Sequence, residues 1–189
     1  MNIHEFSNLI AQKRRELDAL LRRTLPVKVG NMAKAHYQDN FRNQSFTDNG
    51  KQPWPKTRRQ LSGDKSAASN YGALLSSRNH LYSSVKYTPS DYRVRVANDL
   101  EYAAIHNDGG TTNPTVTPKM RRFAWAMYFK HKKGMLPDAA GKWKALALTK
   151  KSRLTIRIPQ RQFIGESAEL NEQIRNKIDS EINNILNKE

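Results

Sequence analysis

The feature that most constrains the fold is a change of apolar period along the chain. Residues 3–24 and residues 167–186 carry apolar residues at steps of three and four, the spacing of one helical face. Between them, residues 81–96 and 153–158 alternate apolar and polar residues, as strands with one buried face do. Strands grouped between terminal helices predict an α+β fold, in which long N-terminal and C-terminal helices pack on one antiparallel sheet.

Local signals set the bounds of the expected helices. Pro26 is expected to interrupt the first helix, because proline has no N–H to donate, and a second helical stretch follows over residues 27–42. Ser167 is expected to begin the last helix, with Glu169 and Glu172 near its positive end.

The strands are expected to form a single sheet. Residues 81–87 and 92–96 predict a hairpin with a turn at 88–91, and residues 102–106 predict a third strand. Residues 153–158 alternate again and predict another strand of the same sheet. The Lys, Ser, Gly and Ala composition of residues 57–70 predicts a mobile surface loop.

The chain of 189 residues is expected to form a single domain, residues 1–189, with a real core. Residues 111–152 are predicted to be an insertion between strands. Within it, residues 119–131 predict a helix ended by Gly134 and Pro137, and a short helix follows over 139–148. The insertion is therefore expected to be helical.

Composition excludes several classes of protein. The chain has no cysteine, which excludes disulfides, thiol nucleophiles and cysteine-based zinc sites. No apolar run approaches the ~20 residues of a membrane span. The first 17 residues hold no apolar core of a signal peptide, so we expect neither a signal nor an anchor and place the chain in the cytoplasm.

The net charge of +16 is unevenly distributed. Residues 119–161 hold thirteen lysines and arginines against Asp138 alone, which is +12 of the total. A field of one sign favours polyanions, so DNA or an acidic protein surface is the expected partner. Ordinary solvated faces of helices and strands are the alternative. The candidate contacts are Lys119, Arg121, Arg122, Lys130, Lys132, Lys133, Lys142, Lys144, Lys150 and Lys151.

Four short motifs follow one another in a fixed order. They are FTDNGKQPW at residues 46–54, LLSSRNHLYSSV at 74–85, YAAIHNDGG at 102–110 and IPQRQFIGES at 158–167. Each is weak alone, but the ordered set resembles the phage virion morphogenesis family, the tail-completion and neck proteins of Mu-like and related tailed phages. The resemblance spans roughly residues 3–186. It implies a protein that assembles virions and catalyses nothing.

The four motifs contain candidate residues for a subunit interface or for maintaining the fold. Glycine permits a tight turn in the first motif and its tryptophan anchors the loop. The departures from the family pattern are Asn49, where proline is common, and residues 77–80 in place of Thr-Gly. The last motif has two interpretations. It is either a connector from strand to helix or the place where an arginine forms bidentate pairs across a subunit interface. The candidate residues are Trp54, Tyr102, His106, Gly109, Arg161, Phe163 and Gly165.

No catalytic, metal or cofactor site is expected. His106 and Asp108 would share one face of a strand, but no third acid or histidine lies near them, and the other histidines lack metal-ligand spacing. Phosphate-binding loops, GxSxG, HExxH and EF-hand motifs are absent from the sequence. A contact at a strand end is the expected role of His106.

Two hypotheses of function follow. By resemblance, the protein is a structural component of the head–tail junction, in the neck, in tail completion or as a tail terminator. It would form a homo-oligomeric ring, six copies being favoured, bind other neck and tail proteins, and pass from the host cytoplasm into the virion. The first helix, with few strong apolar positions, is expected to dock on a neighbouring subunit. The alternative is a sequence-independent nucleic-acid-binding protein that uses the cations and aromatic rings of residues 119–151. A nuclease or lytic enzyme ranks last.

Overall fold

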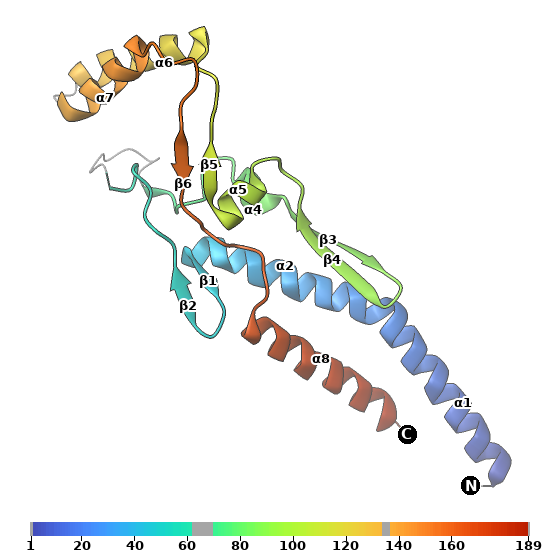
Figure 1. Cartoon of the computed structure of the whole chain (residues 1–189). Helices are drawn as coiled ribbons and strands as arrows, with labels where there is room; N and C mark the ends of the chain where they lie inside the picture. The colour runs from blue at the N-terminus through green and yellow to red at the C-terminus, as the bar shows by residue number, and fades with distance from the viewer. Residues whose placement is uncertain (1, 62–69, 134–136, 189) are drawn as a thin grey trace. The chain divides into compact units, whose positions relative to one another are not determined.

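The computed structural model describes residues 2–61, 70–133 and 137–188, which form two compact units (Figure 1). Unit 1 comprises Met1–Asp108 with Pro159–Glu189, and unit 2 is Gly109–Ile158. The single domain with an insertion over 111–152 stays a prediction. The surface loop expected at 57–70 lies partly outside the described residues, at 62–69.

Helices dominate unit 1, and short strand pairs connect them. The helical elements are α1 (Ile3–Ala19), η1 (Leu20–Thr24), α2 (Leu25–Asn43), α4 (His80–Ser83), α5 (Ala103–Asp108) and α8 (Ala168–Leu186). The strands are β1 (Ser45–Thr47), β2 (Lys51–Pro53), β3 (Val85–Ser90) and β4 (Arg93–Asn98). The chain is therefore of the α+β class, as the sequence predicts.

Unit 2 is a helix pair on a two-stranded ribbon. Its elements are β5 (Gly110–Thr112), α6 (Pro118–Lys133), α7 (Pro137–Leu148) and β6 (Ile156–Ile158). Small alanines at 124, 140 and 147 are the buried apolar residues described here, so the two helices approach closely. The guanidinium of Arg121, near the start of α6, donates hydrogen bonds to the carbonyls of Ala147 and Thr149 at the end of α7. The start of one helix therefore lies beside the end of the other, as in an antiparallel pair. The predicted helix end at Gly134 lies outside the described residues.

The prediction of one sheet is wrong, because the strands in the described part of the chain form three separate two-stranded antiparallel sheets. The pairs are β1 with β2, β3 with β4, and β5 with β6, whose registers include Phe46↔Gln52, Tyr87↔Val96 and Thr111↔Arg157. Four of the six strands have three residues each, too few to recruit a further neighbour. Helix α2 takes the place of a sheet as the framework of unit 1 (Figure 1).

Two of the predicted strand segments are helical. Residues 103–106 of the predicted strand 102–106 lie in α5, where consecutive alanines favour a helix, and Tyr102 lies in the turn before it. Gly109 at φ +72° follows the end of the helix. Leu81, expected in the hairpin, lies in α4 instead, so the hairpin begins at Val85. The predicted strand at 153–158 is shortened to β6 and pairs in unit 2 with β5.

The helix does not break at Pro26. A capping box between Asn2 and Glu5 begins α1, and a π-helical turn, η1, then joins it directly to α2. A proline at position 26 leaves the carbonyl of Arg22 without its usual helical donor. The backbone N–H of Tyr92 donates to that carbonyl at 3.1 Å. The helix continues because another segment supplies the missing hydrogen bond.

The tip of the β3–β4 hairpin is attached to this joint by side chains as well. Asp91 Oδ2 accepts a hydrogen bond from Arg22 Nε at 2.7 Å and forms an ion pair with Arg22 Nη2 at 2.6 Å, and the Tyr92 hydroxyl donates to Asp18. Tyr92 itself adopts φ +58°, a left-handed conformation that non-glycine residues rarely take. On the α2 side, the Tyr87 ring lies where a side chain at Gly30 would stand. The hairpin therefore contacts the long helix on both sides of the π turn.

We expect the Asp91 attachment to weaken in acid. The hydrogen bond from Arg22 lowers the pKa of Asp91 below its ordinary value. Its stabilising contribution is therefore complete above the unfolded pKa of about 3.9 and is lost as the pH falls through the folded pKa. In thermal unfolding, Asp91→Asn should lower the melting temperature at pH 7. The difference in melting temperature from the natural chain should shrink and vanish as the pH falls below about 4. Asp99→Asn, at another exposed aspartate, is the control, and a gap that persists in acid would contradict the assignment.

The core of unit 1 forms around the C-terminal half of α2. Phe41 has an exposed fraction of 0%, and its ring lies 4.9 Å from Phe163, 5.7 Å from Trp54 and 5.9 Å from Tyr82, between centroids. The buried residues of this core are Ala33, Tyr37, Phe41, Trp54, Ala73, Leu81, Val85, Ala103, Phe163 and Leu170. They come from segments far apart in the sequence, so α2 holds the termini of unit 1 together.

Candidate functional site

The motif residues divide into two groups in the structure, and the first group belongs to the core. The Trp54 indole N–H donates to the carbonyl of Gln162 at 2.8 Å, and Phe163 packs on Phe41. Gly165 accepts a hydrogen bond from the Tyr37 hydroxyl at 2.8 Å. These residues connect the segment before α8 to α2 and so maintain the fold.

Arg161 is buried, with 6% of its surface exposed. Its Nε donates to the carbonyl of Pro55 at 3.0 Å, and its backbone N–H donates to the carbonyl of His106 at 2.9 Å. Burial, and secondly the positive charge of Arg59, lowers the pKa of Arg161. A subunit contact by this guanidinium stays a prediction, and it would require the side chain to leave Pro55.

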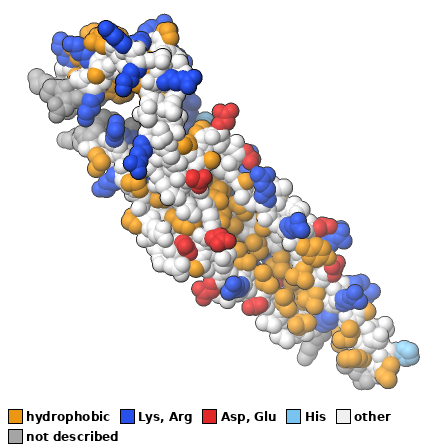
Figure 2. Space-filling model, viewed as in Figure 1, with side chains coloured by type: hydrophobic (Ala, Val, Ile, Leu, Met, Phe, Trp, Pro, Cys, Tyr) orange, Lys and Arg blue, Asp and Glu red, His pale blue; other side chains and the backbone are white. Residues whose placement is uncertain are grey.

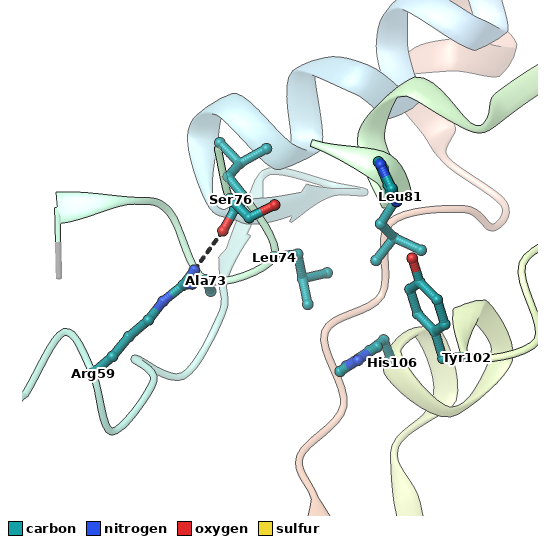
Figure 3. A pocket seen from close by; sticks show the side chains of 9 residues that line it. Arg59, Ala73, Leu74, Ser76, Leu81, Tyr102 and His106 are labelled. Atoms are coloured by element: carbon teal, nitrogen blue, oxygen red, sulfur yellow. Dashed lines mark hydrogen bonds between the residues drawn. The ribbon is translucent and has the colours of Figure 1, made fainter. Parts of the chain in front are cut away.

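The second group, Tyr102 and His106, lines an open pocket of about 210 Å³ (Figure 3). His106 extends from α5 and Tyr102 from the turn just before it, and their rings meet edge to face at 6.1 Å. Across the pocket, Arg59 donates to the carbonyls of Gly72 and Leu75, both at 2.6 Å. Gly109 lies apart from this group, after the end of α5. The pocket wall combines leucines and alanine with a few polar groups.

The His106 imidazole is half-buried in the pocket wall. Burial, followed by the charge of Arg161, lowers its pKa, so the imidazole is neutral at pH 7. Its Nδ1 is buried and has no hydrogen-bond partner among the described residues. Nor do the described residues contain three His, Asp or Glu side chains grouped to hold a metal ion.

The predicted cationic contacts lie together in unit 2. Twelve lysines and arginines stand against one aspartate in this unit, a net charge of +11 out of +16. Arg121 is the exception among the ten candidates, since its guanidinium binds the carbonyl end of α7. The other nine are exposed: Lys119, Arg122, Lys130, Lys132, Lys133, Lys142, Lys144, Lys150 and Lys151. Unit 2 therefore presents a cationic surface to solvent.

Aromatic rings accompany these cations on two sides of α6. Phe123 and His131 both contact the Trp143 ring of α7, at 5.7 and 6.4 Å between centroids. On the other side, Trp125 stacks on Phe129 at 6.0 Å with 27° between the ring planes. Because the alanines occupy the closest helix contact, more than half of the surface of Phe123 and of Phe129 remains exposed.

Helix α1 offers a different kind of surface. It contains no buried residue, although Ile3, Phe6 and Ile10 lie on one face, and Ile3 is 84% exposed. Figure 2 shows hydrophobic and basic side chains next to one another at the end of the chain formed by α1. The Lys13 ammonium donates to the carbonyls of Ile185 and Lys188, which fixes the C-terminal end of α8 against α1. The first turns of α1 extend beyond this contact (Figure 1).

The opposite end of α8 is acidic. Glu169 accepts hydrogen bonds from the backbone N–H groups of Gly50 and Asn49, at 2.6 and 3.1 Å, and the first of these bonds chiefly lowers its pKa. Asp48 in turn accepts from the backbone N–H of Ala168 at 3.0 Å. Two exposed acids, Glu166 and Glu172, lie close in sequence to these hydrogen-bonded carboxylates. We call these four carboxylates the acidic end of α8: Asp48, Glu166, Glu169 and Glu172.

Sequence reasoning missed several of these residues. Arg59, which lines the pocket, falls in a segment whose composition predicts only a surface loop, and no local signal identifies it. Asp18, Arg22, Asp91 and Tyr92 join segments about seventy positions apart, so their spacing carries no periodic signal. The stripe on α1 is visible in the sequence, but its exposure is a tertiary property.

The fold and its surfaces describe an α+β protein that presents an apolar helix and a cationic helix pair to its surroundings. The family model of the phage virion morphogenesis family matches residues 4–183, and the chain belongs to that family. Membership indicates a structural or assembly role in a phage rather than an enzymatic one. No curated protein and no solved structure matches the chain. Among the described residues, no helix is long and apolar enough to cross a membrane.

Proposed function

We propose that the protein is a structural component of the head–tail junction of a tailed phage, where several copies form a ring. The observation that carries this proposal is α1, a capped helix that exposes Ile3, Phe6 and Ile10 and buries none of its residues. Exposed apolar residues aligned on one helical face are costly unless another surface covers them. The protein would be made in the host cytoplasm and then enter the virion at the neck or the tail end.

The occupant of the α1 face in this proposal is a second copy of the chain. Helix α1 carries Lys13, Arg14 and Arg15 beside its apolar stripe, and each copy displays the acidic end of α8 on a different part of its surface. Contacts between two different surfaces of identical subunits are heterologous, and they close into a ring when the rotation allows it. We propose six copies, in keeping with the symmetry of phage tails.

The test of the ring uses three serine substitutions on the apolar face, Ile3→Ser, Phe6→Ser and Ile10→Ser together. The natural chain should sediment and scatter light as an oligomer, and the variant as a monomer with unchanged helix content by circular dichroism. Three serines on the opposite face, at His4, Asn8 and Ala11, form the matched control and should leave the oligomer intact. A natural chain that is monomeric at all concentrations, or a variant that assembles normally, would refute the ring.

The location is tested separately in the phage. Particles produced without the protein should show unattached or incomplete tails by electron microscopy, and the natural chain supplied in trans should restore them. Normal particles would place the protein elsewhere. The partners in this proposal are other neck and tail proteins, which the natural chain should capture from an infected-cell lysate only when α1 is intact.

A second candidate function is sequence-independent binding of nucleic acid. The +11 charge of unit 2 and its nine exposed cations favour this function, since cations that neutralise phosphates release counterions. Tight binding of the isolated protein to DNA with a steep dependence on salt would support it. Weak DNA binding combined with ring formation would favour the first function alone.

A further inference from the structure

We propose that one face of α6 binds single-stranded nucleic acid, with bases stacking on Trp125 and Phe129 and phosphates contacting Arg122, Lys132 and Lys133. We call these five residues the stacking face. This inference rests on the second candidate function and specifies its ligand and its residues.

Helical geometry places the five side chains together. An α-helix turns by about 100° per residue, so positions 122, 125, 129, 132 and 133 fall within an arc of about 100°. Trp125 and Phe129 are one turn apart, and their rings are close to parallel, with 27° between the planes. The cations stand before and after the pair along the same face, at the spacing that puts neighbours three and four residues apart in contact.

The contacts with α7 leave the stacking face open. Ala124 and Phe123, which lie outside this arc, face α7, and Arg121, at the edge of the arc, donates to a carbonyl at the end of α7. Phe129 remains 55% exposed, and the three cations are exposed as well. Trp125 is half-buried and its ring also meets that of Tyr128 at 5.6 Å, so the packing of unit 2 covers the Trp125–Phe129 pair only in part.

The combination of rings and cations favours unpaired bases over other anionic ligands. Aromatic rings stack on any base whose face is open, whereas the bases of a duplex are already stacked on one another. A purely acidic protein surface would require the cations but not the two rings. An anionic bilayer would require a broader apolar face than two rings among three cations.

The experiment measures the binding of labelled oligothymidine, and of a duplex of equal length, to the full chain by fluorescence anisotropy. Trp125→Ala and Phe129→Ala are each expected to weaken oligothymidine binding by about 5- to 150-fold and to leave duplex binding nearly unchanged. Trp125→Phe keeps a ring and should restore most of the affinity. Phe123→Ala is the matched control, since Phe123 is exposed to the same extent, 56%, but contacts Trp143 instead.

The cations are tested by the dependence of binding on salt. Arg122→Ala, Lys132→Ala and Lys133→Ala should each lower the slope of log K against log salt for the single strand by about 0.7. Circular dichroism verifies that every variant keeps its helices. Polyglutamate and anionic vesicles serve as competitors that carry charge without bases, and neither should displace oligothymidine as an unlabelled strand does.

The outcomes separate this inference from the function on which it rests. The protein could bind the single strand and the duplex in a salt-dependent way that the ring substitutions do not change. That result would overturn the stacking face and leave the candidate function standing. Equal losses for strand and duplex, or displacement by polyglutamate or vesicles, would also overturn it. No binding to either nucleic acid would refute both.

Discussion

Replacing Phe41 with alanine is expected to lower the free energy of unfolding by about 3–5 kcal/mol. The side chain is fully buried, and its ring contacts those of Trp54, Tyr82 and Phe163, so truncation leaves a cavity bounded by three aromatic residues. These neighbours come from segments before β3 and before α8, and they cannot all move inward without breaking their own hydrogen bonds. Urea unfolding followed by circular dichroism measures the loss.

The control for Phe41 is the same substitution at Phe129. Phe129 is more than half exposed, and its removal should change the free energy of unfolding by no more than about 0.5 kcal/mol. Similar losses at both positions would show that the C-terminal half of α2 is not the core of unit 1.

Replacing Asn40 with alanine is expected to cost about 2–3 kcal/mol, because two buried backbone groups lose their partner. The side chain, which is 1% exposed, accepts from the Thr47 N–H and donates to the Phe163 carbonyl, both at 3.2 Å. It thereby fixes β1 and the segment before α8 to the same turn of α2.

The matched control is Asn31→Ala on the same helix. Asn31 is exposed, and alanine is the better helix former, so this variant should be neutral or slightly more stable. Both are measured by thermal and urea unfolding. A loss at Asn31 comparable to that at Asn40 would contradict the role given to the buried amide.

The terminal helices and the α+β class could be predicted from the sequence, because stripes such as that of α8 are local and extend over many turns. The prediction of a single sheet was wrong because strand pairing depends on partners that are distant in the sequence. The segment 153–158 alternates, but its partner is β5. The prediction of a strand at 102–106 was wrong because its short apolar run suits a strand or a helix equally, and residues 103–106 lie in α5.

The candidate contacts stay a prediction, but the exposure of most of them follows from their charge. Nine of the ten predicted cations are exposed, whereas Arg121 is occupied by carbonyls of a helix whose position no local pattern reveals. Arg161 has the same difficulty, since its burial depends on the carbonyl of Pro55, about a hundred positions away in the chain. The family itself was predicted from the order of the four motifs and is confirmed by the match over residues 4–183.

The β3–β4 hairpin gives the long N-terminal helix a mechanical property. The π turn at Leu20–Thr24 lacks the regular hydrogen bonds of an α-helix, and alone it would be the place where a lever bends. The hairpin spans this turn, because Tyr92 bonds Asp18 before it and Arg22 within it, and the Tyr87 ring lies against Gly30 beyond it. We therefore expect the hairpin to resist bending at this point and to keep α1 and α2 in a fixed relation when a force acts on the tip of α1.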